Sequence, residues 1–217
     1  MKTSFIGLKI GEGNHRSVHL IDNARCMKIL KPFVEKSYGP LRVRLPTLLY
    51  TYAKFGIRDF NEHEHSVYQQ FFSSPPNNLR GCFERIHGLS EFGLIADVVR
   101  DFDGGLSKTL EITGRVRDAN FWRKLVEVRE FLLENNIPLF DGVGASSIMV
   151  KKLDRFVAMP VFIDFKWLGQ QLYPFQQYLR LRRFAREKTM RRFSRVFQQY
   201  CDLSQESETA PLCGKRI

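Results

Sequence analysis

Residues 6–30 carry the feature that most constrains the fold, a glycine-bearing turn followed by two strand-like runs. The turn contains Gly11 and Gly13, and a β-like run with interspersed polar residues follows from Arg16 to Ile21. Asp and Asn in the next three residues, 22–24, favour a tight turn because they tolerate left-handed backbone and bond their own main chain. The chain then returns as a second strand that carries Lys28. The pattern predicts a β-hairpin with a lysine on its second strand.

This hairpin has the groups that a triphosphate site needs. Gly11 and Gly13 let backbone N–H groups approach phosphate oxygens, and Lys28 supplies a point charge. The arrangement resembles the nucleotide lobe of the protein-kinase-like fold, in which a glycine-rich loop covers ATP and a strand lysine holds its phosphates. A chance pair of glycines and an ordinary exposed lysine are the alternative, because short motifs often match by coincidence. The choice depends on residues further along the chain.

Composition bounds the class of protein. The chain has 217 residues, of which 43% are hydrophobic, so it can bury a core as one domain or as two small lobes. Its four widely spaced cysteines form no CxxC pair, which predicts reduced thiols in a cytoplasmic protein. The chain shows neither a signal peptide at its start nor an apolar run of roughly 20 residues that would span a bilayer. The net charge of +11 favours an acidic partner: nucleotide phosphate, anionic membrane or nucleic acid.

A helix is predicted over residues 61–72, where apolar residues recur at helical spacing. Glu64 lies near the apolar face of this helix, and a pair with Lys28 would fix the ammonium group where it can contact phosphate. The alternatives are a solvated helix charge at this position, or Glu62 in the same role. The basic and aromatic residues 33–60 that precede the helix are interpreted as an insertion, with a short helix around residues 47–55.

The sequence pattern in the middle of the chain predicts a second hairpin, followed by a segment that is not strand-like. Two β-like runs occupy residues 81–87 and 92–99, and residues 100–105 interrupt the pattern. In a two-lobed kinase fold the hinge would run here and its backbone would bond the adenine, with Asp97 and Val99 as the candidate contacts. An amphipathic helix is predicted next, over residues 118–136, with an apolar stripe of Phe121, Leu125, Val128 and Leu132.

Two aspartates flank a third predicted hairpin. Asp141 lies in a polar loop before a strand at 148–150, and a second strand, 158–163, ends on Asp164. This order resembles the kinase catalytic loop followed by the metal-binding DFG segment. Asp141 would then contact the acceptor hydroxyl, and Asp164 would hold Mg²⁺, a cation that prefers carboxylate and phosphate oxygen. Each aspartate alone is an ordinary loop residue, so their order and strand context carry the inference.

The chain resembles the PhoP regulatory network protein YrbL family, small bacterial proteins with a kinase-like fold. The matching stretches are residues 10–30, NEHEHSVYQQF (61–71), GLIADVVRDFDGG (93–105), REFLLENNI (129–137) and VFIDFKWLG (161–169). The resemblance implies an α+β, two-lobed, minimal protein-kinase-like fold, distantly similar to lipopolysaccharide-core kinases. Its antiparallel-sheet N-lobe would span residues 1–100 and include the insertion. A reduced helical C-lobe would span 101–201, with a disordered tail at 202–217.

Several departures from the kinase pattern bear on activity. Leu139 and Phe140 stand before Asp141 in place of the usual His-Arg pair, and Ser146 or Ser147 takes the place of the asparagine that binds a second Mg²⁺. Lys166 replaces the glycine of DFG, and no activation segment follows. A reduced kinase for a small-molecule or lipid- or sugar-linked hydroxyl acceptor fits these departures. So does a pseudokinase that binds nucleotide or a partner without turnover.

The stretch 172–200 is basic and aromatic. Phe193, Val196, Phe197 and Tyr200 repeat at helical spacing, and the same stretch contains eight arginines and lysines. The aromatic stripe is interpreted as core, whereas the cations leave three alternatives: solvated charges, a peripheral contact with the anionic inner membrane surface, or phosphate contacts to nucleic acid. The sequence thus favours ATP- and Mg²⁺-dependent phosphoryl transfer, with a pseudokinase and a basic nucleic-acid-binding protein as alternatives.

Overall fold

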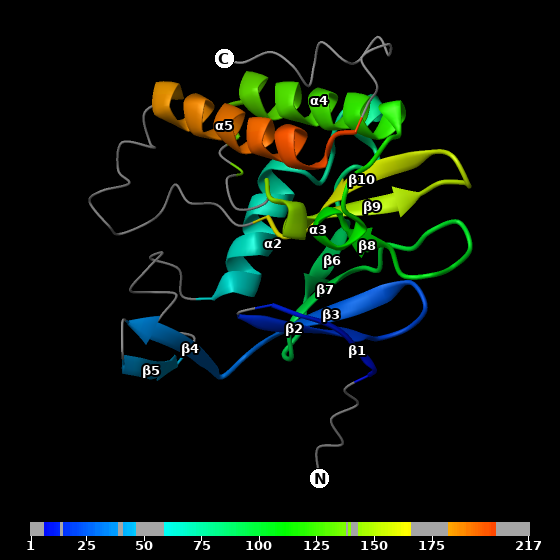
Figure 1. Ribbon diagram of the computed structural model, residues 1–217. Coiled ribbons are helices and arrows are strands. Elements are labelled where there is room, and N and C mark those ends of the chain that lie inside the picture. The colour runs from blue at the N-terminus through cyan, green and yellow to red at the C-terminus, as the bar shows by residue number, and fades with distance from the viewer. Residues whose placement is uncertain are drawn as a thin grey trace. The chain divides into compact units, whose positions relative to one another are not determined.

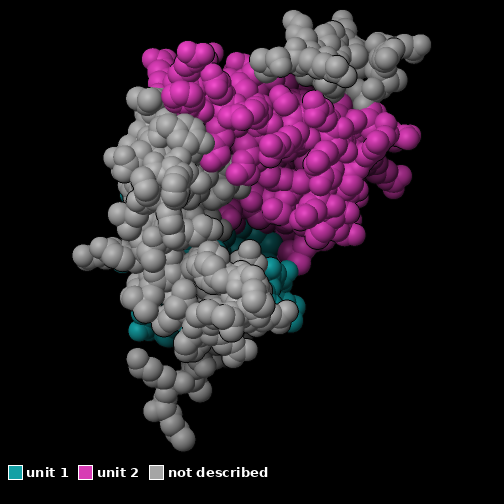
Figure 2. Space-filling view, turned by 60° about the vertical axis from the view of Figure 1, so that its left-hand side comes forward, with its two compact units in different colours: residues 1–73, 85–98, 170–175 teal, residues 74–84, 99–169, 176–217 magenta. Residues whose placement is uncertain are grey.

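The computed structural model describes two compact units, coloured separately in Figure 2. Unit 1 comprises residues 1–73, 85–98 and 170–175, and unit 2 comprises residues 74–84, 99–169 and 176–217. The residues whose structure is described are 7–13, 15–38, 41–46, 59–137, 139, 143–165 and 182–202. Strands and helices occur in both units, so the predicted α+β class is confirmed. The lobe boundaries expected from the sequence remain a prediction.

Unit 1 is built on a five-stranded antiparallel sheet of order β1-β2-β3-β7-β6 (Figure 1). The strands are β1 (Lys9–Glu12), β2 (Arg16–Leu20), β3 (Arg25–Leu30), β6 (Ile86–Leu89) and β7 (Leu94–Asp97). The hairpin predicted within residues 6–30 is β2–β3. Its turn forms as expected, because Asp22 Oδ1 accepts hydrogen bonds from the N–H groups of Ala24 (2.9 Å) and Arg25 (2.7 Å).

The second predicted hairpin is present as β6–β7, but its first strand was placed too early. Residues 82–84 belong to unit 2, where Cys82 O accepts from Phe162 N (2.7 Å) and Glu84 N donates to Phe162 O (2.9 Å). Their apolar and polar pattern is that of a strand, but they pair with a distant segment. The insertion contains a hairpin that was not predicted, β4 (Phe33–Tyr38) with β5 (Leu41–Pro46). The helix predicted around 47–55 lies outside the described residues.

Helix α2 (Phe60–Phe71) packs on the sheet of unit 1 and contacts β3, β6 and β7. It begins at Phe60 because Asp59 caps it, accepting from the N–H groups of Asn61 (2.6 Å) and Glu62 (3.2 Å). The buried side chains of the sheet in this unit include Cys26, Ile86, Leu94 and Ala96, and those of the helix include Val67 and Tyr68. The predicted helix is confirmed, one residue earlier than expected.

Unit 2 packs two long helices with a three-stranded antiparallel sheet of order β10-β9-β8. Its elements are β8 (Lys108–Thr109), α3 (Leu110–Thr113), α4 (Ala119–Glu134), β9 (Ile148–Lys152), β10 (Ala158–Phe162) and α5 (Arg182–Tyr200), with 3₁₀ turns at Asn77–Leu79 and Ala145–Ser147. Helix α4 contacts both β10 and α5 (Figure 1). Asp118 joins helix to sheet, because its carboxylate accepts from Asn120 N (2.8 Å) at the start of α4 and from Ala158 N on β10.

Aromatic rings fill the core of unit 2. Trp122 on α4 meets Phe197 on α5 with ring centroids 5.2 Å apart, and Phe162 on β10 meets Phe193 at 6.4 Å. All four residues of the stripe predicted for α4 are buried, as are Phe193, Val196 and Phe197 of the stripe predicted for α5. Among the described residues, no helix is long and apolar enough to cross a membrane.

The expectation of reduced cysteines is correct for Cys26 and Cys82, which are buried free thiols, and wrong for Cys201, which is disulfide-bonded. A disulfide depends on how closely two Cβ atoms approach in space, which wide sequence spacing does not reveal. Burial raises the pKa of the Cys82 thiol to about 11, so this residue behaves as an inert core side chain.

Removing one ring from the core of unit 2 should destabilise the protein. We expect Phe193→Ala to lower the free energy of unfolding by about 3–5 kcal/mol, since the ring is fully buried and leaves a cavity. Urea unfolding followed by circular dichroism measures the change. Phe184→Ala is the control on the same helix, because Phe184 is 38% exposed and its loss should cost less than the loss of fully buried Phe193. Equal losses in the two variants would contradict the packing described.

Candidate functional site

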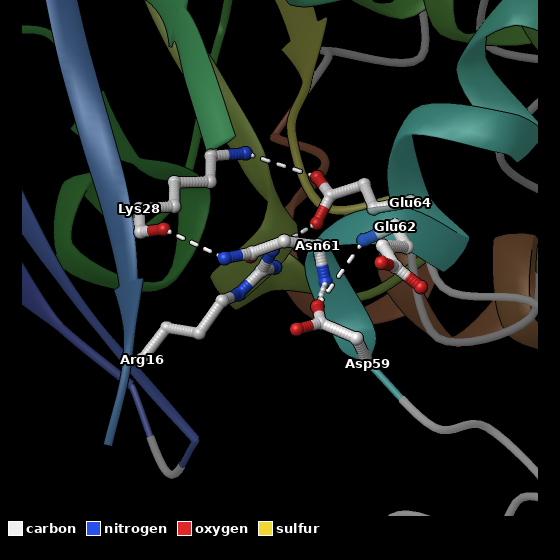
Figure 3. Close-up of polar contacts among 6 residues, drawn as sticks. All are labelled: Arg16, Lys28, Asp59, Asn61, Glu62 and Glu64. Atoms are coloured by element: carbon white, nitrogen blue, oxygen red, sulfur yellow. Dashed lines mark hydrogen bonds and ion pairs between the residues drawn. The ribbon is translucent and has the colours of Figure 1, made fainter. Parts of the chain in front are cut away.

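The candidate site in unit 1 centres on a buried ion pair between strand β3 and helix α2 (Figure 3). Lys28 Nζ lies 3.0 Å from Glu64 Oε1, and the side chains are 7% and 0% exposed. Lys28 pairs with Val18 on β2 and with Leu94 on β7, in the middle of the sheet. The pair proposed from the sequence is therefore present. Figure 3 shows the exposed Glu62 directed away from Lys28, so Glu64 is the carboxylate that contacts the lysine.

A second cation, Arg16, shares the same carboxylate. Its Nη1 donates to Glu64 Oε2 and to Asn61 Oδ1 (3.2 Å), and Asn61 Nδ2 donates to the backbone oxygen of Lys28 (3.0 Å). Arg16 and Asn61 are both buried. These bonds join the first turn of α2 to the neighbouring strands β2 and β3, which fixes Glu64 relative to Lys28.

Sequence reasoning missed the roles of Arg16 and Asn61, although one signal was available for the arginine. In the β2–β3 register Val18 is opposite Lys28 and Arg16 is opposite Leu30. Directly opposed residues of an antiparallel pair point to the same face, so Arg16 and Lys28 share a face of the sheet. A three-residue turn at 22–24 implies this register. The bonds of Asn61 depend on the angle at which α2 packs, and the sequence pattern does not contain that angle.

The electrostatics of the site keep Glu64 ionised. Burial by itself would raise the pKa of Glu64, but the charges of Arg16 and Lys28 and their hydrogen bonds outweigh burial and hold this pKa well below its usual range. A buried carboxylate is costly without such partners, and losing one partner leaves an uncompensated charge. Glu64 is thus a fixed negative charge that orients two cations.

The two glycines of the first turn lie on and after β1. Gly13 N donates to Arg16 O (2.8 Å), which closes the turn into β2. Neither Gly11 nor Gly13 has the left-handed backbone that would by itself favour glycine. A Cβ added at Gly11 would meet Val18 at 3.7 Å, and one added at Gly13 would meet Arg16 O at 3.8 Å, both ordinary contact distances. The local chain therefore has room for side chains at both positions.

The backbone at the predicted hinge is partly engaged within the protein. Asp97 N donates to Arg85 O (2.9 Å), and Val99 O accepts from Ser107 N (3.1 Å). The Asp97 carboxylate contacts His87 Nε2 at 2.6 Å. The carbonyl of Asp97 accepts from Cys26 Sγ (3.8 Å), and contact of this segment with adenine stays a prediction.

In unit 2 the candidate metal residues lie at one end of the β9–β10 hairpin. Ile148 pairs with Phe162, and Ile163 N donates to Ser147 O (3.0 Å) just beyond the last strand pair. Asp164 follows with φ of 71°, an uncommon left-handed conformation for a residue other than glycine. The carboxylate of Asp164 and the hydroxyl of Ser147 are oxygen donors of the kind that Mg²⁺ takes together with phosphates and water. Asp141 lies outside the described residues.

Within the described ranges no group of three or more His, Cys, Asp or Glu residues is placed to hold a metal ion.

A comparison with protein families matches residues 7–201 to the model of the PhoP regulatory network protein YrbL. The chain belongs to the YrbL family. The matched region includes the Lys28–Glu64 pair, the β9–β10 hairpin and Asp164. The residues of the candidate site therefore all lie within the part of the chain that matches the YrbL family. A comparison with curated proteins found no match.

The lowered pKa of Glu64 makes stability depend on pH in a defined direction. Ionised Glu64 stabilises the fold above its ordinary pKa of 4.5, and this contribution is lost as pH falls from 4.5 through its folded-state value of about 2. Glu64→Gln keeps the size and removes the charge, so we expect it to lower the free energy of unfolding by roughly 3–5 kcal/mol at pH 7. The difference from wild type should shrink below pH 4.5.

Chemical unfolding of both proteins between pH 7 and pH 2.5 measures this difference. Glu62→Gln is the matched control, because Glu62 is an exposed neighbour on the same helix turn and its loss should have little effect at any pH. A difference between wild type and Glu64→Gln that stays constant over the whole range would contradict the assignment.

Proposed function

We propose that this protein is a kinase-like phosphotransferase that transfers the γ-phosphoryl group of ATP to a hydroxyl acceptor. The observation that carries the proposal is the buried Lys28–Glu64 pair, which joins the strand hairpin that follows the glycine turn to helix α2. A buried ion pair is a weak source of stability, since well-packed apolar residues often serve as well. A lysine held in one orientation by a buried carboxylate is better explained by a task that needs a positioned ammonium, such as binding phosphate.

The glycine turn supports the same proposal. Because the conformations of Gly11 and Gly13 would accept a side chain, the fold alone does not account for glycine at these positions. Glycine also serves where a ligand approaches the backbone closely. A phosphate group bound by the N–H groups of this turn is a ligand of that kind.

Asp164 adds a third line of support. A left-handed aspartate costs of order 1–3 kcal/mol and persists where the surrounding structure imposes it, which happens often at functional sites. With Ser147 as the neighbouring oxygen donor, Asp164 is the residue we assign to Mg²⁺. When bound, Mg²⁺ neutralises charge on the transferring phosphates.

In the proposed reaction each residue has a separate task. Lys28 donates hydrogen bonds to phosphate oxygens, and Glu64 holds Lys28 in place. Asp141 accepts the proton of the acceptor hydroxyl, whose oxygen bonds to the γ-phosphorus while the bond to the β-phosphate oxygen breaks and ADP leaves. Positioning and charge neutralisation supply most of the catalysis in such transfers, so this reduced set of groups suffices. We propose a cytoplasmic location on the same basis, because the proposed reaction consumes ATP.

A pseudokinase is the second candidate, and one structural observation favours it. Arg16 competes with Lys28 for Glu64, so part of the charge of this carboxylate is directed to a group outside the predicted catalytic set. Lys166 in place of the DFG glycine and a serine in place of the metal-binding asparagine point the same way. Nucleic-acid binding draws on the exposed arginines of α5, such as Arg191 and Arg195, and has less support.

Binding of Mg²⁺-ATP should raise the melting temperature, and Asp164→Asn should remove most of that rise. Asparagine keeps the size and tolerates left-handed backbone, so the variant removes the charge with little effect on the fold. At about 100 times Kd, ATP would stabilise the native state by about 2.7 kcal/mol, which a thermal-shift assay detects readily. Gly13→Ala should also weaken ATP binding at least tenfold while leaving the unliganded melting temperature unchanged.

Phe92→Ser, at an exposed turn of unit 1, is the control that should bind ATP as wild type does. A full ATP response in Asp164→Asn and Gly13→Ala would rule out the proposed nucleotide site. Screening ATP, ADP and GTP with Mg²⁺ or Mn²⁺ extends the same measurement to other nucleotides and metals.

Turnover separates the enzyme from the pseudokinase. Purified protein incubated with γ-labelled ATP and Mg²⁺ should release labelled phosphate or transfer it to an added hydroxyl acceptor, and Asp141→Asn should reduce the rate at least 100-fold because the proton acceptor is lost. Binding of ATP without any release of label would favour the pseudokinase.

A further inference from the structure

Two neighbouring turns of unit 2 expose four large apolar side chains. Phe156 (87% exposed) and Leu153 (44%) lie in the turn between β9 and β10, and Phe102 (53%) and Leu106 (42%) lie in the turn that precedes β8. We call these four residues the apolar tip. Figure 1 shows both turns projecting beyond the same end of the β8–β9–β10 sheet.

The two turns are joined to each other and to the sheet. Phe102 N donates to Lys152 O (2.9 Å), and the Asp101 carboxylate accepts from Lys152 N (3.0 Å). These bonds connect the turn before β8 to the end of strand β9. The turn that carries Phe102 is therefore bonded to the hairpin that carries Phe156, and both residues belong to one surface of unit 2.

Each turn is also closed internally. Asp154 Oδ1 accepts from the N–H groups of Phe156 (2.6 Å) and Val157 (2.8 Å), and Arg100 Nη1 donates to Gly104 O (2.8 Å). Phe156 is therefore held in the solvent by an ordered turn. Single exposed apolar residues are common, but a group of four on adjoining turns is typical of an interaction surface.

The charges around the apolar tip indicate the partner. Five cations lie on the two turns and their adjoining strands, against three carboxylates: Arg100, Lys108, Lys151, Lys152 and Arg155, with Asp101, Asp103 and Asp154. All three carboxylates accept backbone N–H bonds, and Asp103 and Asp154 are exposed, as are Lys108, Lys152 and Arg155. The cations outnumber the carboxylates, so this surface carries a net positive charge. Aromatic residues flanked by exposed lysine and arginine are the combination that binds the interface of an anionic lipid bilayer.

We propose that the apolar tip inserts into the interfacial region of an anionic membrane, with Phe156 and Phe102 at the acyl boundary and Lys152 and Arg155 at the lipid headgroups. The basic helix α5 is less suited to insertion, because Phe193, Val196 and Phe197 on its apolar stripe are buried in the core. The proposal goes beyond phosphoryl transfer and does not depend on it.

Vesicle co-sedimentation of the full chain tests the proposal. We expect binding to vesicles of phosphatidylcholine mixed with phosphatidylglycerol, and at least tenfold weaker binding to phosphatidylcholine alone. The double variant Phe102→Ser/Phe156→Ser should bind the anionic vesicles at least tenfold more weakly than wild type. Phe92→Ser is the control, because Phe92 is about as exposed (52%) as Phe102 (53%) but lies on a turn of unit 1, and this variant should bind as wild type does.

A second measurement reports insertion directly. Phe156→Trp places an indole at the centre of the tip, and its fluorescence should shift to the blue and be quenched by brominated lipid in anionic vesicles. A spectrum unchanged by vesicles would overturn the proposal. So would binding that survives Phe102→Ser/Phe156→Ser but is lost in Arg191→Ala/Arg195→Ala, which would place the contact on α5. Concentration-dependent self-association that the double serine variant abolishes, without vesicle binding, would instead make the tip a protein interface.

Discussion

The structure of unit 1 depends on one fully buried carboxylate. Glu64 has no exposed surface, and a charge in that position persists because Arg16 and Lys28 approach it from two neighbouring strands. These contacts connect β2 and β3 to helix α2. Asn61 adds to the constraint, because its amide group bonds both to Arg16 and to the backbone of Lys28. Three elements are thereby held together by polar contacts, in a region where apolar packing alone would allow small adjustments.

The same constraint links the glycine turn to the ion pair. The N–H of Gly13 bonds to the carbonyl of Arg16, whose side chain reaches Glu64. A ligand that changed the path of the turn would therefore act on a residue whose side chain bonds the carboxylate that orients Lys28. In a kinase-like enzyme this connection would align the lysine when phosphate binds. In a pseudokinase it would transmit nucleotide binding to α2.

Much of the fold could be predicted from local pattern, because helical spacing and turn chemistry are local properties. The β2–β3 hairpin follows from the turn at Asp22, α4 begins at its capping residue Asp118, and the aromatic stripe of α5 is buried as its spacing indicates. Features that depend on distant approaches could not be predicted this way. Residues 82–84 pair with β10, Cys201 is disulfide-bonded, and Arg16 shares Glu64. The left-handed backbone of Asp164 is likewise imposed by surroundings that the sequence does not display.

The proposed phosphoryl transfer and the proposed membrane contact both bear on which acceptor the protein uses. A kinase of proteins needs a platform on which an extended peptide docks, and the sequence after Asp164 contains no recognisable activation segment. A small or lipid-linked hydroxyl needs no such platform, but a lipid-linked acceptor must be reached at a membrane surface. If the proposed phosphoryl transfer holds, membrane binding by Phe156 would favour a lipid-linked acceptor over a free metabolite, because a metabolite in solution does not require a membrane contact.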